Sequence, residues 1–420
     1  MNFSWQEFLN IRKNAGINGL GKMLLALFKN EIQTELANIL GWWVEHMTDN
    51  HYGGFIGRID GFGKKHPEAD KGIILNTRIL WTYSKVFKKT GEVQYLDLAN
   101  RAYHYIHDHF WDYKNNGVFW MVDCRGKVVS TQKQIYAQAF AIYALSAYFE
   151  IQPDPSIALQ IDQIFQCIEK YSRDKQKGGY LNVFDEDWSL SADQRLSDKD
   201  ADQVKIMNTH LHILEAYTAL NKVLPRPEYQ SALEYILEIY LNQFCSRKPC
   251  HVYLFFDEDW NPTSKEKSFG HDIESSWLLC EAAESLDNPR LILRARNTSM
   301  GLAEAVFESG KDNLGGIYEK TDPSGQEIEK EKHWWPQAEA VVGFLNAWEI
   351  SGNELFLQQA MQTWHFIQDH FIDPEGGEWH WLLDEKNSPN RKEDKAGPWK
   401  APYHNVRMCL EVLRRIKVEQ

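Results

Sequence analysis

Residues 117–149, GVFWMVDCRGKVVSTQKQIYAQAFAIYALSAYF, contain the glycine element, the turn and the apolar helix that recur along the chain. A glycine is followed by β-branched and aromatic residues, then by a polar turn, and then by residues 135–149, which are apolar on nearly every side. Apolar residues recur in this last segment at spacings of three and four, which indicates a helix. A helix with so little polar surface belongs inside the molecule.

The glycine element of this unit recurs along the chain. Copies begin at Gly53, Gly117, Gly178, Gly315 and Gly376, about 60 residues apart with one double gap. The gap contains residues 251–256, HVYLFF, which resemble the same element without its glycines. The chain therefore contains six units, and each is too long for one helix and suits a pair. A fixed period of this kind indicates a repeat architecture.

Two kinds of helical segment alternate through these units. The segments expected inside show little polar surface and lie at residues 73–86, 135–149, 207–220, 272–285, 337–349 and 405–416. Those expected outside carry charge on one face and lie at residues 93–110, 157–171, 229–244, 290–307 and 354–371. We predict an all-α (α/α)6 barrel of six inner and six outer helices, with short β-hairpin-like loops at one end. An open solenoid of the same helix pairs is the structural alternative.

No proline- or serine-rich linker divides the chain. We expect a helical N-terminal extension over residues 1–34 and a single barrel domain over residues 35–420. The apolar run at residues 19–28 is shorter than a membrane span, and no small-residue cleavage site follows it as in a signal peptide. The polar segment at residues 189–205 is either a mobile loop over the site or a solvated connector.

Composition narrows the class of partner. The net charge of −13 argues against nucleic acids and polyanionic substrates, which need a basic surface, and a neutral substrate fits best. The 16 Trp, 18 Tyr and 21 Phe suit core packing and also platforms for sugar rings. The six cysteines lack zinc-site spacing, so we expect reduced thiols in a cytoplasmic protein. We also expect a monomer or weak homodimer that binds no membrane.

Each predicted inner helix begins with polar or ionisable residues, which the outer helices lack. They are Asn76, Arg78, Tyr136, Gln138, Asn208, His210, His212, His271, Glu274, Trp335, Glu339, His404 and Arg407. If the six inner helices run parallel, these groups converge at one end of the barrel, where the helix N-termini add partial positive charge. That arrangement suits a developing oxyanion.

Single residues in this set have simpler interpretations. A lone histidine on an apolar helix is more often a hydrogen-bonded core residue, and Glu339 could be a buried partner for Arg78. His271 and Glu274 are three apart, so the carboxylate could orient the imidazole. Trp335 and Trp399 could stack on sugars or plug the barrel mouth. Three histidines on three units at one helical depth are nevertheless unusual for core packing.

Two other kinds of site compete with proton transfer by histidines. His210 and His212 have the H-x-H spacing of metal sites on strands, but two residues apart on a helix point in different directions. An inverting glycoside hydrolase would use two carboxylates, for which Glu274 with Glu339, or Asp185 with Asp187, are candidates. A sugar-binding protein without catalysis is a further alternative.

At these residues the chain resembles the N-acylglucosamine 2-epimerase superfamily, in particular its cellobiose 2-epimerase family. The matching blocks are residues 70–81 (DKGIILNTRILW), 207–212 (MNTHLH), 269–274 (FGHDIE), 334–340 (WWPQAEA), 397–400 (GPWK) and 402–405 (PYHN). The similarity extends in the same order over nearly everything after about residue 35. The chain departs from the family pattern at Ala401, where Cys is usual, and at Val406, where Gly is usual.

The resemblance implies an (α/α)6 barrel that uses no cofactor and no metal. It implies reversible epimerisation at carbon 2 of the reducing-end glucose of β-1,4-linked disaccharides; an N-acylglucosamine 2-epimerase or a mannose isomerase is the alternative within the superfamily. By position it gives His271 and His404 as the acid/base pair and His212 as a third catalytic histidine. It also implies a substrate-binding shell of Arg78, Tyr136, Asn208, Glu274, Trp335, Glu339 and Trp399.

Overall fold

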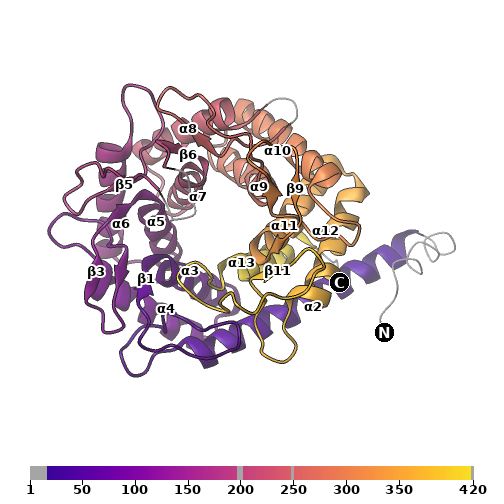
Figure 1. Cartoon of the computed structure of the whole chain (residues 1–420), viewed down its shortest axis with the longest axis horizontal. Helices are drawn as coiled ribbons and strands as arrows, with labels where there is room; N and C mark the ends of the chain where they lie inside the picture. The colour runs from indigo at the N-terminus through magenta and orange to yellow at the C-terminus, as the bar shows by residue number, and fades with distance from the viewer. Residues whose placement is uncertain (1–16, 196–201, 247–249, 418–420) are drawn as a thin grey trace.

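The computed structural model describes residues 17–195, 202–246 and 250–417, in which twelve α-helices form two concentric layers (Figure 1). The inner layer consists of α3 (Ile73–Thr90), α5 (Ile135–Phe149), α7 (Met207–Val223), α9 (Phe269–Ser285), α11 (Trp334–Ser351) and α13 (Tyr403–Arg415). The outer layer consists of α2 (Ile17–Met47), α4 (Val93–Tyr105), α6 (Pro155–Cys167), α8 (Pro227–Ile239), α10 (Pro289–Ser309) and α12 (Glu354–Phe366).

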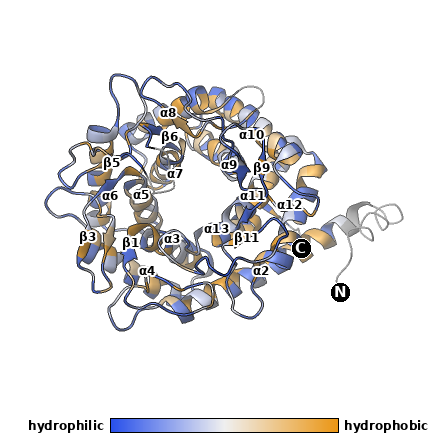
Figure 2. Ribbon diagram, viewed as in Figure 1, coloured by the Kyte–Doolittle hydropathy of each residue, from blue (hydrophilic) through white to orange (hydrophobic). Residues whose placement is uncertain are grey.

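The inner helices form a closed ring. Each packs against the next along the chain, and α13 packs against α3 to complete the circle. The predicted (α/α)6 barrel is therefore confirmed, and the open solenoid is excluded. Figure 2 shows hydrophobic residues on the helices of both layers and hydrophilic residues on the loops in front of them. No helix in the described ranges combines the length and apolar character needed to cross a bilayer.

Short strands cover one end of the ring, as predicted, because they immediately precede the inner helices. The pairs are β1 (Lys71–Gly72) with β2 (Met121–Val122), β4 (Lys133–Gln134) with β5 (Val183–Phe184), β6 (Lys205–Ile206) with β7 (Phe255–Phe256), and β10 (Lys332–His333) with β11 (Leu382–Leu383). Three further strands complete two hairpins: β3 (Val128–Ser130) pairs with β2, and β9 (Ile328–Glu329) pairs with β8 (Lys320–Thr321). Each of the four cross-unit pairs is antiparallel and ties one unit to the next.

Four outer helices end in a single π-turn, which in three of them leads into a glycine element and in the fourth into residues 251–256. These turns are η1 (Ile106–Phe110), η2 (Ile168–Ser172), η3 (Tyr240–Phe244) and η4 (Ile367–Phe371). The glycines that follow are required by close packing as well as by backbone angle. Gly179 has a φ of +77°, and a Cβ there would lie 2.6 Å from the ring of Trp260.

A buried lysine–aspartate pair recurs in five of the six units. The Nζ–Oδ2 distances are 2.7 Å for Lys71–Asp49, 2.8 Å for Lys133–Asp112, 2.7 Å for Lys205–Asp174, 3.2 Å for Lys332–Asp312 and 2.7 Å for Lys395–Asp373. The unit whose element lacks glycines differs, because there His251 Nδ1 lies 2.6 Å from Asp272 Oδ2. Each lysine connects the residues before an inner helix to the end of the neighbouring outer helix.

The N-terminal helix α2 completes the outer layer. It packs against α13, and its Phe28 and Ile32 are buried in the core. The boundary expected between residues 34 and 35 falls inside this helix, and residues 1–16 lie outside the described part of the chain. The division into an extension and a barrel domain stays a prediction. Residues 196–201 of the expected lid or connector also lie outside the described ranges, and all six cysteines are free thiols.

Candidate active site

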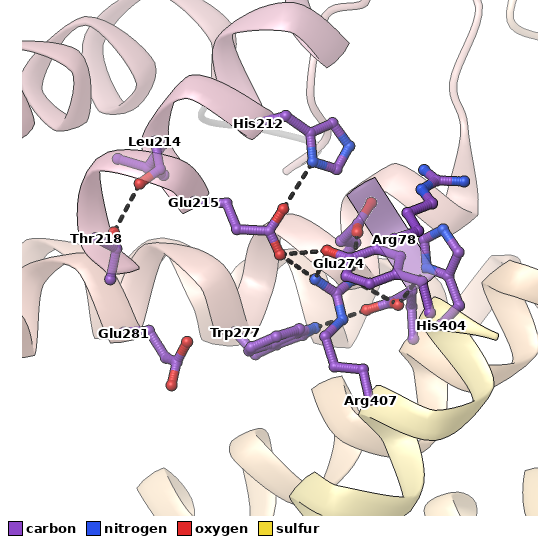
Figure 3. Close-up of polar contacts among 12 residues, drawn as sticks. Arg78, His212, Leu214, Glu215, Thr218, Glu274, Trp277, Glu281, His404 and Arg407 are labelled. Carbon is purple, nitrogen blue, oxygen red and sulfur yellow. Dashed lines mark hydrogen bonds and ion pairs between the residues drawn. The ribbon is translucent and has the colours of Figure 1, made fainter. Parts of the chain in front are cut away.

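Two-residue strands fix where α3, α5, α7 and α11 begin, and Ser268 caps the start of α9, so the polar residues near these helix starts lie at a similar depth. Residues spaced by four and then by three share one helix face. On α7 these are Asn208, His212 and Glu215, and their partners on other helices show that this face points into the ring. Figure 3 shows His212 of α7, Glu274 of α9, and His404 and Arg407 of α13 turned toward one another.

His212 is buried, and its Nδ1 lies 2.8 Å from Oε2 of Glu215. The centroid of its ring lies 4.8 Å from the ring centroids of Tyr136 and Phe140 on α5. Burial lowers the pKa of His212 below its ordinary value, although the bond to Glu215 acts in the opposite direction. His212 is therefore a neutral imidazole held in place on two sides.

His404 is held by a second carboxylate. Its Nδ1 lies 2.7 Å from Oε1 of Glu339, and Trp277 Nε1 donates to Oε2 of the same carboxylate at 3.0 Å. Burial lowers the pKa of His404 to about 3. Burial alone would raise the pKa of Glu339, but the charge of Arg407 and the bond from His404 lower it below its usual value.

His271 lies in the same pocket as the other two histidines. Its ring centroid is 4.8 Å from that of Trp335, which in turn lies 5.7 Å from His404. Burial lowers the pKa of His271 to about 3, and positive charge on His212 or His404 would lower it further. The three imidazoles, from α7, α9 and α13, therefore meet around one space.

The partner expected for His271 is wrong. Its Nδ1 lies 2.8 Å from Oγ of Ser268, the residue that caps α9, and not beside Glu274. A hydroxyl can donate or accept, so Ser268 is compatible with either tautomer of His271. Among the described residues, His212 and His404 have orienting carboxylates and His271 has an orienting hydroxyl.

Arg407 of α13 lies at the centre of the polar layer below the pocket. Its Nη2 donates to Oε1 of Glu274 and to Oε1 of Glu339, both at 2.7 Å, and its Nη1 donates to Oε1 of Glu215. Burial and the charge of Glu339 raise the pKa of Glu274 to about 8, whereas the charge of Arg407 holds that of Glu215 at about 2 against the effect of burial. The pKa of Glu274 is thus shifted upward and that of Glu215 downward, although both accept from Arg407.

Arg78 lies on α3, which packs against α13, and it binds other groups than Glu339, the partner that the sequence offered as one possibility. Its Nη1 donates to the carbonyl oxygen of Trp399 at 2.6 Å, and its Nη2 donates to the hydroxyl of Tyr136 at 2.9 Å. The rings of Tyr136 and Trp399 are 5.9 Å apart. Arg78 therefore joins the loop before α13 to α5, and a guanidinium without a buried carboxylate partner among the described residues is suited to a developing negative charge.

The remaining members of the expected binding shell line the same mouth. Trp335 and Trp399 are only partly buried, and Trp335 contacts both His271 and His404. Asn208 is also partly buried, and its Oδ1 has no hydrogen-bond partner in the described part of the chain. The structure thus brings together the three candidate histidines and all seven candidate binding residues.

The H-x-H pair does not form a metal site. His210 points into the barrel wall, where its Nε2 accepts from the backbone N–H of Tyr180 at 2.9 Å and its Nδ1 donates to the carbonyl of Ile206 at 2.8 Å. Both of its nitrogens are therefore used. Within the described ranges the only cluster with metal-ligand geometry is Glu274, Glu339 and His404, and the guanidinium of Arg407 already binds both carboxylates.

Sequence reasoning missed Glu215 and Trp277. Both follow a named site residue, His212 or Glu274, by three positions, so an i, i+3 search down each inner helix would have found them. Asp185 and Asp187, in contrast, lie in an exposed turn after β5 and are not part of the pocket.

Comparison with known proteins identifies the family of the chain. The sequence model of the N-acylglucosamine 2-epimerase family matches residues 54–408. A cellobiose 2-epimerase of Bacteroides fragilis is 44% identical over 92% of this chain and 99% of its own length. The crystal structure of a sugar epimerase from a ruminal bacterium superposes with a TM-score of 0.89 at 35% identity, over 92% of this chain and 99% of its own.

A second solved structure gives the same result. Cellobiose 2-epimerase from Bacillus thermoamylovorans superposes with a TM-score of 0.88 at 31% identity, and the match covers 93% of this chain and 100% of that one. The similarity therefore extends over the whole barrel and includes every helix that contributes to the pocket. The chain belongs to the N-acylglucosamine 2-epimerase family and is a carbohydrate epimerase.

Proposed function

We propose that this protein interconverts the carbon 2 epimers of the reducing-end sugar in β-1,4-linked disaccharides, such as cellobiose and glucosyl-mannose or lactose and epilactose. The observation that carries the proposal is the meeting of His212, His271 and His404 around one pocket. The substrate class follows the cellobiose 2-epimerases that are similar to the chain over almost its whole length.

The chemistry requires an acid and a base near neutral pH. The sugar ring opens first, so that the aldehyde at carbon 1 acidifies the C–H bond at carbon 2. A base removes that proton and leaves an enediolate, and an acid returns a proton to the opposite face. Neutral imidazoles perform both steps, since each accepts a proton in one direction and donates it in the other.

We assign His271 and His404 as this acid/base pair and His212 as the third catalytic histidine. Arg78 and the N-termini of the inner helices stabilise the oxyanion of the enediolate. The two tryptophans at the mouth provide platforms for the sugar rings, and the polar residues around them bind hydroxyls. This shell comprises Tyr136, Asn208, Glu274, Trp335, Glu339 and Trp399. One histidine removes a proton and the other returns one, so the proposed reaction needs no cofactor.

The alternative activities differ in their products. An inverting hydrolase needs two carboxyl groups roughly 6.5–9.5 Å apart with a water between them. The oxygens offered by Glu274 and Glu339 lie within 4.8 Å of each other, and Arg407 binds both carboxylates. This geometry disfavours hydrolysis, whereas an N-acylglucosamine 2-epimerase or mannose isomerase would use the same histidines on a smaller sugar.

One experiment separates these activities. The purified protein is incubated in heavy water with cellobiose, lactose, mannose and N-acetylglucosamine, and the products are identified by NMR. We expect an intact disaccharide with mannose at the reducing end and deuterium at its carbon 2. Free glucose would indicate a hydrolase, turnover of the monosaccharides alone would indicate the other family activities, and epimerisation without deuterium would contradict the enediolate.

We further propose that the enzyme works in the cytoplasm as a monomer or weak homodimer. The six free thiols are compatible with a reducing compartment. All the residues assigned above come from one chain, so the site needs no second subunit.

A further inference from the structure

A carboxylate that the proposed mechanism leaves unused lies behind His212. Oε2 of Glu215 lies 2.8 Å from His212 Nδ1, while Oε1 accepts from the hydroxyl of Tyr403 and from Nη1 of Arg407 (Figure 3). The side chain of Glu215 is only 3% exposed. We propose that Glu215 is a positioning residue that fixes which ring nitrogen of His212 carries the proton, an inference that rests on the function proposed above.

The other hydrogen bonds of Glu215 allow it only to accept a hydrogen bond from His212. Tyr403 and Arg407 are both donors to Oε1, and Arg407 is itself held by Glu274 and Glu339 on its other nitrogen. The carboxylate is therefore anchored and can only accept at Oε2. His212 must place its proton on Nδ1, and the lone pair of the neutral ring is then on Nε2, where it can accept a proton or polarise a sugar hydroxyl.

Glu215 also borders a second cavity at the opposite end of the barrel. This cavity, of about 450 Å³, is lined by the C-terminal halves of the inner helices, including Trp81, Tyr143, Lys222 and Glu281. It reaches Glu215, Trp277 and Arg407 but none of the three candidate histidines. The layer around Arg407 thus separates the two ends, and Glu215 is the residue that contacts a histidine on one side and the far cavity on the other.

A glutamine at this position tests the proposal directly. In Glu215→Gln the amide oxygen would remain with the two donors, Tyr403 and Arg407, and the amide NH2 would face His212. The ring would then have to accept at Nδ1 and carry its proton on Nε2. We expect kcat on cellobiose to fall by up to about 10⁴-fold, the loss that a comparable tautomer change causes in a catalytic triad, with KM changed by less than about threefold.

Glu281→Gln is the matched control. Glu281 lines the same far cavity and pairs with Lys222 at 3.3 Å, but no bond to His212 or Arg407 connects it to the network. The control should keep wild-type kcat and KM. Glu215→Gln with kcat within about threefold of wild type would overturn the proposal.

Nitrogen-15 NMR of histidine-labelled protein, with His212→Gln used for assignment, gives a readout that a merely structural role would not move. The wild-type enzyme should show His212 protonated on Nδ1, and Glu215→Gln should show it protonated on Nε2. If His212 of the wild-type enzyme is protonated on Nε2, the proposal is overturned. This test needs no variant at position 215, so it can be made even if Glu215→Gln does not fold.

The far cavity permits a third measurement. In Glu215→Ala, formate entering from the far end should restore part of kcat without competing with the disaccharide, because the two enter at opposite ends of the barrel. Chloride at the same concentration should not restore it. If formate competes with the substrate, or does not restore activity in a folded variant, the role assigned to Glu215 is contradicted. If the wild-type enzyme shows no turnover, the proposed function is refuted instead.

Discussion

His210 and His212 are two residues apart, yet they face different surroundings. Gln138 and Gln337 occupy the position of His210 in other units and bind the backbone of Val118 and Ile317 as His210 binds that of Tyr180. His210 is thus a wall residue that a glutamine can replace. His271 and His404, in contrast, bind Ser268 and Glu339 through their side chains.

We predict that His271→Ala and His404→Ala each lower kcat by about 10²–10⁴-fold, as expected when a general acid or base is lost. Disaccharide binding should persist, because the tryptophans and Arg78 remain. Steady-state kinetics and calorimetric titration with cellobiose measure the two effects. Loss of binding in step with loss of turnover would show that these histidines hold substrate rather than move its proton.

His210→Gln serves as the control for both variants. It removes a buried imidazole from the same helix end but keeps an acceptor for Tyr180 N–H, so turnover should stay within about threefold of wild type. A loss as large as that of His404→Ala would mean that the distinction drawn between wall and pocket histidines is wrong.

At the scale of elements, the lysine–aspartate pairs join the layers of the barrel. Lys133 is fully buried, and its Nζ lies 2.8 Å from Asp112 Oδ2. We predict that Lys133→Met lowers the free energy of unfolding by about 3–5 kcal/mol, because it leaves the Asp112 carboxylate buried without its cation. Urea unfolding at pH 7 measures the loss.

The double variant Lys133→Met/Asp112→Asn checks this reason. Asparagine keeps the acceptor for the N–H groups of Lys114 and Asn115 but carries no charge. The double variant should therefore be more stable than Lys133→Met alone. Equal or additive losses would indicate that Lys133 acts through packing of its aliphatic chain.

The elements also show what the sequence could and could not predict. Helix spacing predicted both layers and the depth of the histidines, because periodicity and helix starts are local properties. The carboxylate partners were not predicted correctly, since a bond such as Glu339 to His404 joins residues 65 positions apart. Glu274 was placed beside His271 by spacing alone, but Arg407 competes for it more strongly.

For the whole molecule, buried histidines make stability depend on pH. Burial lowers the pKa of His210, His271 and His404 from 6.5 to about 3 and that of His380 to about 4. Below pH 6.5 the unfolded chain binds protons at these sites that the native protein does not, so stability falls as the pH falls. The raised pKa values of Glu35, about 7, and Glu274, about 8, act in the opposite direction but involve fewer groups.

We therefore predict that the free energy of unfolding decreases between pH 7 and pH 5.5. Urea titrations at both values measure it. In His210→Gln the dependence on pH should be weaker by roughly one proton, because one of the four sites is removed. A stability that rises on acidification would show that the two carboxyl groups outweigh the histidines.

Helix α2 completes the outer layer and forms hydrogen bonds with residues from the other end of the chain. Trp379 Nε1 donates to Oε1 of Glu35 at 2.7 Å, Trp364 Nε1 donates to Oε2 of Glu31 at 3.0 Å, and Trp42 Nε1 donates to the carbonyl of Gly376 at 3.0 Å. Residues more than 300 positions apart thus form a single seam of hydrogen bonds.

This seam has a consequence for synthesis. As the chain leaves the ribosome, Trp42 emerges early, but its partner Gly376 is translated only near the end. For most of that time the nascent α2 presents uncovered indole surface, which is the kind of segment that chaperones bind. The last unit to be translated therefore covers the first. A ribosome stalled before residue 364 would hold a chain whose α2 has none of these partners.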